Sequence, residues 1–380
     1  MLKRTRWPLI AILGLAMLAG AACSDDDDPT ATATSPSSAS SSSGGSGTTS
    51  STSGSSSSTE AAGPEATEDP RADWPDEFIL GMFGGDDAEE TLETNEPLRL
   101  KLEEGLGMPV TIFTGTSYNA VIEAMRADRV DAMVVGPFSY VLAVQEADAE
   151  ALAVFQGCST SEDPCVYTEG RPTHYQSVVF TLKGNGIETL DDIIGKGFNF
   201  VDPASTSGHL APKTLLIKRG YDPDVQFETR FAGSHPTSVI SVFNGSADAG
   251  ATNEGNLTRL QDAAEVDVCL WPDGQINIPR TEEYIRQTFE DCPDGHIAIL
   301  ALTDPIPSTP FGIRQELPES FKQAVLDVLL SLKDDPEYVT ERRAWFVDPT
   351  EDLGLERLDQ YYNVLRDIAK LLDLDLAELD

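Results

Sequence analysis

Three successive hydroxyl residues, Ser205, Thr206 and Ser207, stand where an apolar run ends and a helical pattern begins. The run 198–201 is typical of the end of a buried strand, and the pattern over 208–219 predicts a helix. A strand-to-helix turn presents free backbone N–H groups and the positive end of the helix dipole to one point, where hydroxyls add further donors. The turn therefore predicts a site for a small oxyanion. The plainer alternative is that the three residues only cap the helix.

Three other expected helices begin with polar groups that can donate hydrogen bonds. Their starts carry Ser117 and Tyr118, Ser139 and Tyr140, and Ser234 and His235. In a parallel α/β sheet every helix begins at the carboxyl edge of the strands, where ligands bind. Two facing lobes would therefore bring all four helix starts to one cleft. No Gly-Lys-Ser/Thr signature is present, which excludes a nucleotide P-loop.

Apolar runs alternate with helical patterns through residues 73–380, which predicts an α/β fold with sheets rich in parallel strands. About 300 residues suffice for two lobes. We expect strands over 78–83, 109–113, 132–135, 175–182, 198–201, 226–231, 247–251, 266–271 and 298–302. We expect helices over 88–106, 117–126, 190–194, 208–219, 233–244 and 256–264, one opening at 136, and an entirely helical end over 316–333, 337–345 and 355–372.

The first 72 residues have the composition of an export signal and a tether. Residues 1–23 combine a basic start, an apolar core and the small residues before Cys23, which predicts a lipoprotein signal peptide with lipidation at Cys23. Plain secretion is the alternative. Residues 24–72 are rich in Ser, Thr, Gly and Asp, and we expect a disordered tether.

The formal net charge of −38 argues against a nucleic-acid-binding protein. The overall field would also repel anions, so an oxyanion site in this chain must work through local donors. The chain has five cysteines, and with Cys23 lipidated four remain, for which three pairings are possible. We expect nearest-neighbour disulfides, Cys158–Cys165 and Cys269–Cys292. No Cys-x-x-Cys pair supports the alternative of a zinc site, so no metal is expected.

Several motifs between about residues 76 and 345 together resemble one family. They are 118–125, 130–131, 136–140, 175–178, 200–208, 232–235, 242–245, Asp248 and 251–253. The chain is similar to the solute-binding proteins of phosphate, phosphite and phosphonate ABC importers. The resemblance implies a two-lobed periplasmic-binding-protein fold of type II with two crossover strands. It also implies ligand capture and delivery to a membrane permease, with no cofactor.

The expected first lobe holds residues 73–180 and 300–380, and the second holds 181–299. Crossings near 178–182 and 298–303 would form the hinge, and closure about this hinge would bury the ligand.

The resemblance also suggests site residues. Ser205, Thr206 and Ser207 would hold the ligand oxygens, Tyr118 and Tyr175 would donate from the opposite lobe, and His235 would contact the same group. Ser139 is a further candidate, which either donates to the ligand or caps its helix. His174, His209 and His296 are expected to be surface or packing residues.

Ligand identity depends on two acidic positions in the family members that bind aminoethylphosphonate. The first is a Glu before an Asn-Leu pair, and the second is an Asp before a Pro. Gly255 and Thr309 stand at these positions here, although Glu254 and Asp304 lie close by in the sequence. We expect a ligand without an amino group, phosphite or a small phosphonate, with phosphate less favoured.

The sequence therefore predicts a monomeric, exported, membrane-anchored binding lipoprotein that works with an ABC permease and its ATPase. A sensory protein that presents its ligand to a membrane receptor is an alternative. A hydrolase that uses Ser207 and His235 is disfavoured because no Gly-x-Ser-x-Gly elbow is present, and we expect no enzymatic activity.

Overall fold

The computed structural model describes residues 71–85, 87–158 and 162–372. The expected signal peptide, the lipidated Cys23 and the tether up to residue 70 lie outside these residues. Within them, no helix combines the length and apolar character needed to cross a membrane.

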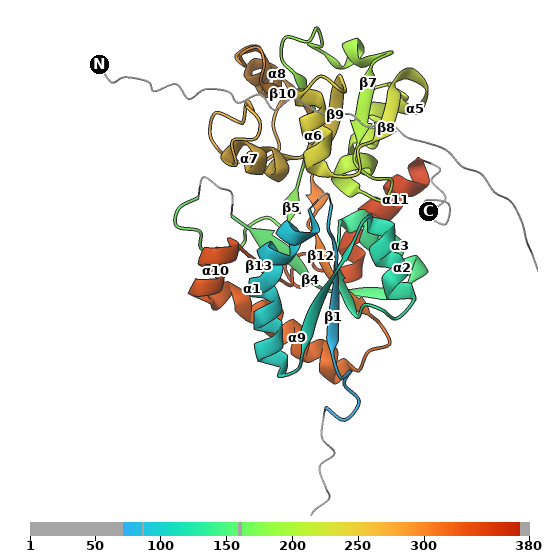
Figure 1. Ribbon diagram of the computed structural model, residues 1–380, viewed down its shortest axis with the longest axis vertical. Helices are drawn as coiled ribbons and strands as arrows, with labels where there is room; N and C mark the ends of the chain where they lie inside the picture. Colours follow the sequence, from blue (N-terminus) through green and yellow to red (C-terminus); the bar gives the residue numbers. More distant parts are fainter. Residues whose placement is uncertain (1–70, 86, 159–161, 373–380) are drawn as a thin grey trace, which may run out of the picture. The chain divides into compact units, whose positions relative to one another are not determined.

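The first lobe is built on a six-stranded sheet with strand order β13-β4-β12-β3-β1-β2. Its strands are β1 (Phe78–Phe83), β2 (Val110–Gly115), β3 (Ala132–Val134), β4 (Ala149–Gly157), β12 (Pro310–Arg314) and β13 (Ala344–Val347). Strands β1, β2 and β3 are parallel, whereas β12 and β13 run antiparallel to their neighbours. The helices of this lobe are α1 (Ala88–Leu106), α2 (Tyr118–Arg126), α3 (Pro137–Glu146), α9 (Glu319–Ser331), α10 (Pro336–Arg342) and α11 (Asn363–Leu371), with short 3₁₀ turns η3 (Leu332–Asp334) and η4 (Leu358–Tyr362) (Figure 1).

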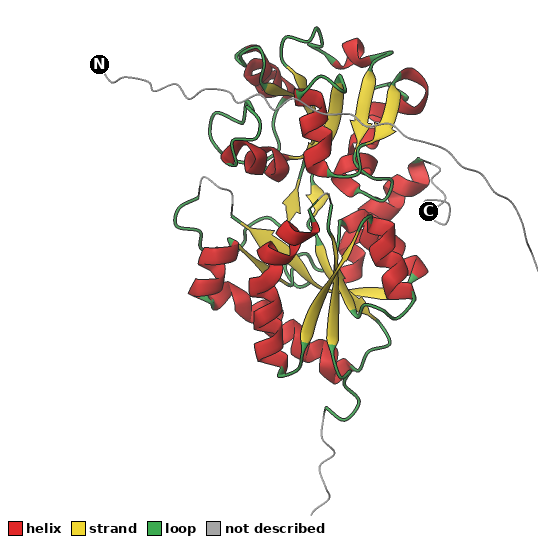
Figure 2. Ribbon diagram, viewed as in Figure 1, coloured by secondary structure: helices red, strands yellow, loops and turns green. Residues whose placement is uncertain are grey.

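The second lobe is built on a five-stranded sheet with strand order β10-β6-β9-β7-β8. Its strands are β6 (Ser177–Leu182), β7 (Gly197–Phe200), β8 (Glu228–Phe231), β9 (Ala249–Asn253) and β10 (Ile297–Leu302). Strand β7 is parallel to β8 and β9, and β6 is antiparallel to β9 and β10. The helical elements are η1 (Leu190–Ile193), the π-helical turn η2 (Thr206–Leu210), α4 (Ala211–Lys218), α5 (Pro223–Gln226), α6 (His235–Phe243), α7 (Glu254–Asp262) and α8 (Glu282–Glu290) (Figure 2).

Helix periodicity explains how the first lobe closes its core. Helix α1 buries Leu98, Leu102 and Leu106, four residues apart, and α9 buries Phe321, Val325 and Leu329 at the same spacing. Residues four apart lie on one face of a helix, so each helix presents an apolar stripe. All six side chains belong to one buried cluster with β1.

Two short strands join the lobes. Strand β5 (His174–Tyr175) pairs antiparallel with β11 (Ile306–Pro307), between the two sheets in the chain path. The C-terminal part of the chain holds both crossings, because the Tyr361 hydroxyl donates to Thr173 O at 2.5 Å and the Tyr362 hydroxyl donates to Ser308 O at 3.0 Å.

The crossings differ from the sequence expectation in their position. The expected lobe boundaries, 180/181 and 299/300, fall inside β6 and β10, which pair with each other in the second sheet. The chain therefore changes lobe at β5 and β11. A continuous apolar run shows that a strand is buried, but it does not show where the chain leaves the sheet.

Three expected elements are also corrected. Residues 266–271 form no strand, apart from a single bridge between Val268 and Ile297. The expected helical end over 316–372 is interrupted by β13, which joins the first sheet. Helix α10 ends at Arg342, since Arg343 takes a positive φ of 52° and the chain then enters β13. Both sheets contain parallel strands, as expected, and both also contain antiparallel ones, namely β12 and β13 in the first sheet and β6 and β10 in the second.

Both expected disulfides are present. The Cα atoms are 5.7 Å apart in Cys158–Cys165 and 5.8 Å apart in Cys269–Cys292. Each bond closes a loop, one in each lobe. Residues 159–161 of the Cys158–Cys165 loop are not described.

Candidate ligand-binding site

A cavity of about 450 Å³ is lined by residues of both lobes and of the crossing strands. The lining residues include Phe83, Tyr118, Gly136, Gln156, Cys158, His174, Tyr175, Ser205, Thr206, Ser207, His235, Asn253, Gly255, Ile276, Asn277, Ser308 and Thr309. None of the lining residues, all in the described part of the chain, is Asp, Glu, Lys or Arg. An anion bound here would be held by neutral donors.

The hydroxyl turn starts helix η2 directly after β7. Ser205 caps it, because the Ser205 Oγ accepts a hydrogen bond from Gly208 N at 3.0 Å. Gly208 is required here, since a Cβ at this position would lie 2.3 Å from Val201 Cβ. The Thr206 Oγ1 accepts from Phe138 N of the first lobe at 2.7 Å. The two hypotheses for this turn are therefore compatible, because one hydroxyl caps the helix while all three residues line the cavity.

His209 and Asp202 fix the turn from behind. The Nδ1 atom of His209 lies 2.8 Å from Pro203 O, and Asp202 Oδ1 accepts from Ala204 N at 2.8 Å. Burial lowers the pKa of His209 to about 4, so its ring is neutral at pH 7. His209 packs edge-on against Phe200 and is absent from the cavity lining, in agreement with its expected packing role.

Tyr118 and Tyr175 reach the cavity from the first lobe and the crossing. Tyr118 stands at the start of α2 and stacks on Phe83, with ring centroids 4.2 Å apart. Burial raises the pKa of Tyr118, an effect that the Ser205 hydroxyl partly offsets. Burial also raises the pKa of Tyr175 to about 12 against the hydrogen-bonding effect of Ser207 and Thr206. Both phenols therefore keep their protons at pH 7 and can donate to an anion.

His235 is the first residue of α6, and Ser234 caps this helix by accepting from Thr237 N at 3.2 Å. Its Nδ1 atom lies 2.9 Å from Thr252 Oγ1 of β9. Burial lowers the pKa of His235 to about 4, so the imidazole is uncharged at pH 7. It is a neutral hydrogen-bonding group on the cavity wall.

Ser139 has a different position from the other predicted residues. Its hydroxyl donates to Ala204 O of the second lobe at 2.8 Å, and the residue is fully buried. It is absent from the cavity lining. Ser139 thus links the two lobes beside the hydroxyl turn, and it does not cap its helix, which starts after Gly136 without a side-chain cap.

Gly255 and Thr309, the two positions that the family resemblance singles out, both line the cavity. The neighbouring acid Glu254 is turned away, because its carboxylate accepts from the Trp271 indole N–H and from Asn277 N. Burial raises the pKa of Glu254 to about 7, although both hydrogen bonds act against this shift. Asp304 is exposed and forms an ion pair with Lys218 at 2.9 Å. Neither acid belongs to the cavity lining.

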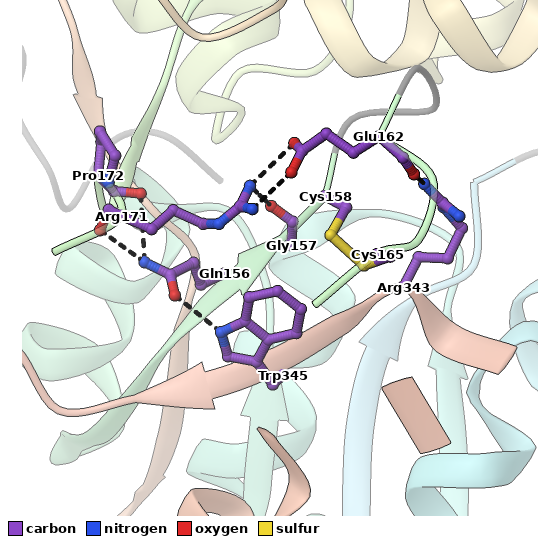
Figure 3. Close-up of polar contacts among 9 residues, drawn as sticks. All are labelled: Gln156, Gly157, Cys158, Glu162, Cys165, Arg171, Pro172, Arg343 and Trp345. Atoms are coloured by element: carbon purple, nitrogen blue, oxygen red, sulfur yellow. Dashed lines mark hydrogen bonds and ion pairs between the residues drawn. A yellow bond between two sulfur atoms is a disulfide. The ribbon is translucent and has the colours of Figure 1, made fainter. Parts of the chain in front are cut away.

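Sequence reasoning missed three polar residues that line the cavity, Gln156, His174 and Asn277, of which His174 was expected to be a surface or packing residue. His174 directly precedes Tyr175, which is the one sequence signal that could have indicated it. Gln156 is oriented by Trp345, whose indole N–H donates to Gln156 Oε1 at 2.7 Å, while Gln156 Nε2 donates to Arg171 O at 2.7 Å. Figure 3 shows these contacts beside the Cys158–Cys165 disulfide. These contacts hold Gln156, two residues before Cys158, in place on the cavity lining.

The arrangement suits binding better than turnover. Hydroxyls, phenols and a neutral imidazole can together surround an oxyanion with hydrogen-bond donors. Among the described residues no group of three or more His, Cys, Asp or Glu side chains is placed to hold a metal ion.

Comparisons with known proteins give one family. Residues 80–348 match the model of the periplasmic substrate-binding proteins of phosphonate ABC transporters. The phosphate-import protein PhnD of Mycolicibacterium smegmatis is 31% identical over 185 residues, 47% of this chain and 55% of the relative. The phosphonates-binding periplasmic protein of Escherichia coli is 25% identical over 255 residues, 66% of this chain and 64% of the relative. The matches thus span less than two thirds of either relative.

Solved structures show the same fold. PhnD1 of Prochlorococcus marinus, in complex with methylphosphonate, superposes with a TM-score of 0.57 at 16% identity, covering 79% of this chain and 99% of that chain. A binding protein component of an ABC phosphonate transporter from Pseudomonas aeruginosa gives a TM-score of 0.56 at 20% identity, covering 80% and 96%. The family-model match covers most of both lobes, so the chain belongs to the family of periplasmic substrate-binding proteins of phosphonate ABC transporters.

Proposed function

We propose that this protein captures a small phosphorus oxyanion outside the cytoplasm and delivers it to an ABC permease and its ATPase. A lipid at Cys23 would anchor it to the membrane, and the tether 24–72 would give the binding unit its reach. The observation that carries the proposal is the meeting of the 205–207 hydroxyls, two phenols and His235 in one cavity without a charged lining residue.

The proposed ligand has no amino group, and phosphite and methylphosphonate fit best. A buried ammonium without a carboxylate partner is costly, and the two positions that would supply the carboxylate are Gly255 and Thr309. Glu254 is occupied by Trp271 and Asn277, so it is not placed to replace them. The complex of the Prochlorococcus marinus neighbour with methylphosphonate supports the same ligand class.

Isothermal titration of the purified protein with phosphite, methylphosphonate, phosphate and aminoethylphosphonate in one buffer tests the proposal. We expect phosphite or methylphosphonate to bind tightest, and aminoethylphosphonate to bind at least about tenfold more weakly, roughly 1.4 kcal/mol. Tightest binding of aminoethylphosphonate would contradict the ligand assignment. Absence of binding for all four compounds would contradict the proposed function.

A gain-of-function variant sharpens the test. The double substitution Gly255→Glu and Thr309→Asp places acids at the two positions, and it should shift preference toward aminoethylphosphonate. At Gly255 a Cβ would lie 3.3 Å from Asn253 Oδ1, so the Asn253 side chain must shift by a few tenths of an ångström to accept the new side chain. Glu265→Gln is the control, since it changes an exposed acid outside the cavity lining and should leave the order of the four ligands unchanged.

A further inference from the structure

Two buried polar side chains, Thr252 and Asn256, form a hydrogen-bonded line with the ring of His235. Asn256 Nδ2 lies 3.1 Å from Thr252 Oγ1, and Thr252 Oγ1 lies 2.9 Å from His235 Nδ1. Thr252 is fully buried, and Asn256 is only 8% exposed. The start of α7 fixes Asn256, whose backbone N–H donates to Asn253 Oδ1 at 2.8 Å. The three residues come from α6, β9 and α7, so the line depends on the fold of the second lobe.

The hydrogen atoms in this line can be assigned one by one. An amide nitrogen only donates, so the Thr252 oxygen accepts from Asn256. The Thr252 hydroxyl has one hydrogen of its own, and a buried hydroxyl that does not donate is costly. In the described part of the structure, the other side-chain partner of this oxygen is His235 Nδ1. The hydroxyl is therefore the donor, and Nδ1 is the acceptor.

We infer that Asn256 and Thr252 are positioning residues that fix the tautomer of His235, with the imidazole proton on Nε2, where it can donate to the bound oxyanion. Nε2 is the ring nitrogen not engaged by Thr252, on a residue that lines the cavity. The other tautomer would present a lone pair to a ligand oxygen and repel it. The inference rests on the proposed function for its ligand, but the tautomer is a property of the protein alone.

The chain contains its own reference for this tautomer. His209 Nδ1 lies 2.8 Å from the carbonyl oxygen of Pro203, which can only accept, so His209 carries its proton on Nδ1. Burial lowers the pKa of both His209 and His235 to about 4, so both rings are neutral at pH 7. The two histidines should thus show opposite tautomers in the same spectrum.

The test is a long-range ¹H–¹⁵N spectrum of the ligand-free full chain labelled with ¹⁵N-histidine. The chain has four histidines, and His235→Gln identifies the signal of His235. We expect a protonated Nε2 in His235 and a protonated Nδ1 in His209. A protonated Nδ1 in His235 would overturn the inference. No ligand is added for this spectrum. Failure of the tautomer assignment is therefore distinguishable from failure of the proposed function, which calorimetry measures.

Two substitutions at Thr252 test the consequence for binding. Thr252→Val keeps the shape but removes the hydroxyl, so the Nε2–H tautomer should lose its dominance and the affinity for the tightest-binding phosphorus oxyanion should fall about three- to tenfold. Thr252→Ser keeps the hydroxyl and should preserve both the tautomer and the affinity. An unchanged tautomer and affinity in a folded Thr252→Val protein would overturn the inference. If that variant does not fold, the unsubstituted protein and Thr252→Ser still decide through the spectrum.

Discussion

The three side chains of the hydroxyl turn differ in the number of partners they have within the protein, because Ser205 also meets Tyr118 and Thr206 also meets Tyr175. The Ser205 Oγ is engaged by Gly208 N, and the Thr206 Oγ1 by Phe138 N. The Ser207 hydroxyl meets Tyr175 at the cavity, while its carbonyl accepts from Ser177 Oγ at 2.5 Å. Ser207 is therefore the residue of the three whose side chain is most available to a ligand.

Replacing Ser207 should weaken binding more than replacing a nearby buried serine. A hydrogen bond to a charged ligand contributes about 1.5–3 kcal/mol, so Ser207→Ala should reduce the affinity for phosphite or methylphosphonate about ten- to hundredfold. Ser139→Ala is the control, because this hydroxyl binds Ala204 O and lies outside the cavity lining. Titration calorimetry on both variants decides the matter, and an equal or larger loss in Ser139→Ala would contradict the assignment.

The two serines also show how far residue-level prediction reaches. Ser207 follows from the sequence because a strand, a hydroxyl run and a helix are contiguous, so the geometry is local. Ser139 stands at a similar helix start, yet its hydroxyl is used by the opposite lobe. His174 shows the opposite outcome. It was expected to be a surface or packing residue, yet it lines the cavity because it lies in the crossing strand β5. Contacts between lobes decide both positions, and no local pattern encodes them.

At the scale of elements, the two disulfide-closed loops contribute differently to the site. Cys158 itself lines the cavity, and the short loop it closes is held at Glu162 by an ion pair with Arg171. Cys269 and Cys292 enclose a longer loop that supplies Ile276 and Asn277 to the cavity. Glu254 already holds this loop at Asn277 N and at Trp271, independently of the disulfide.

Removing each disulfide should therefore have a distinct effect. The sequence separations are 7 and 23 residues, so the chain-entropy model gives Cys269–Cys292 about 1 kcal/mol more stabilisation than Cys158–Cys165. We expect the Cys269→Ser/Cys292→Ser pair to lower the free energy of unfolding more, and the Cys158→Ser/Cys165→Ser pair to lower ligand affinity more. Urea unfolding and calorimetry measure the two effects, and the reverse order in both would contradict this division.

A helix or strand could be predicted where the spacing of its apolar residues alone determines its type. Helix α1 follows from the spacing of Leu98, Leu102 and Leu106. Strand β13 does not, because residues 344–347 continue an apparently helical segment and become a strand only by pairing with β4. In the run 266–271, Val266, Val268 and Trp271 are buried, and Trp271 donates to Glu254 rather than to a sheet neighbour. Tertiary pairing overrides the local pattern in both segments.

At the scale of the whole molecule, the proposed anion site lies within a strongly acidic chain. The net charge is −38, and the cavity lining has no cation to oppose this field. The field at long range therefore repels an incoming oxyanion, whereas the donors at the site act only at hydrogen-bond distance. The composition alone predicted that the long-range field opposes anion binding. No basic residue in the described cavity lining counteracts this repulsion.

The rate of ligand association should consequently rise with ionic strength. Salt screens the repulsion between the acidic protein and the anion, because the Debye length falls from about 30 Å at 0.01 M to about 10 Å at 0.1 M. The dissociation rate should change little, since the buried hydrogen bonds are screened much less. Stopped-flow fluorescence with phosphite or methylphosphonate at the two salt concentrations measures both rates. Repeating the series with Lys183→Glu, a change of charge outside the cavity lining, should steepen the dependence of the association rate on salt. An association rate that falls as salt is added would show that an attractive local field controls capture, contrary to the uncharged site described above.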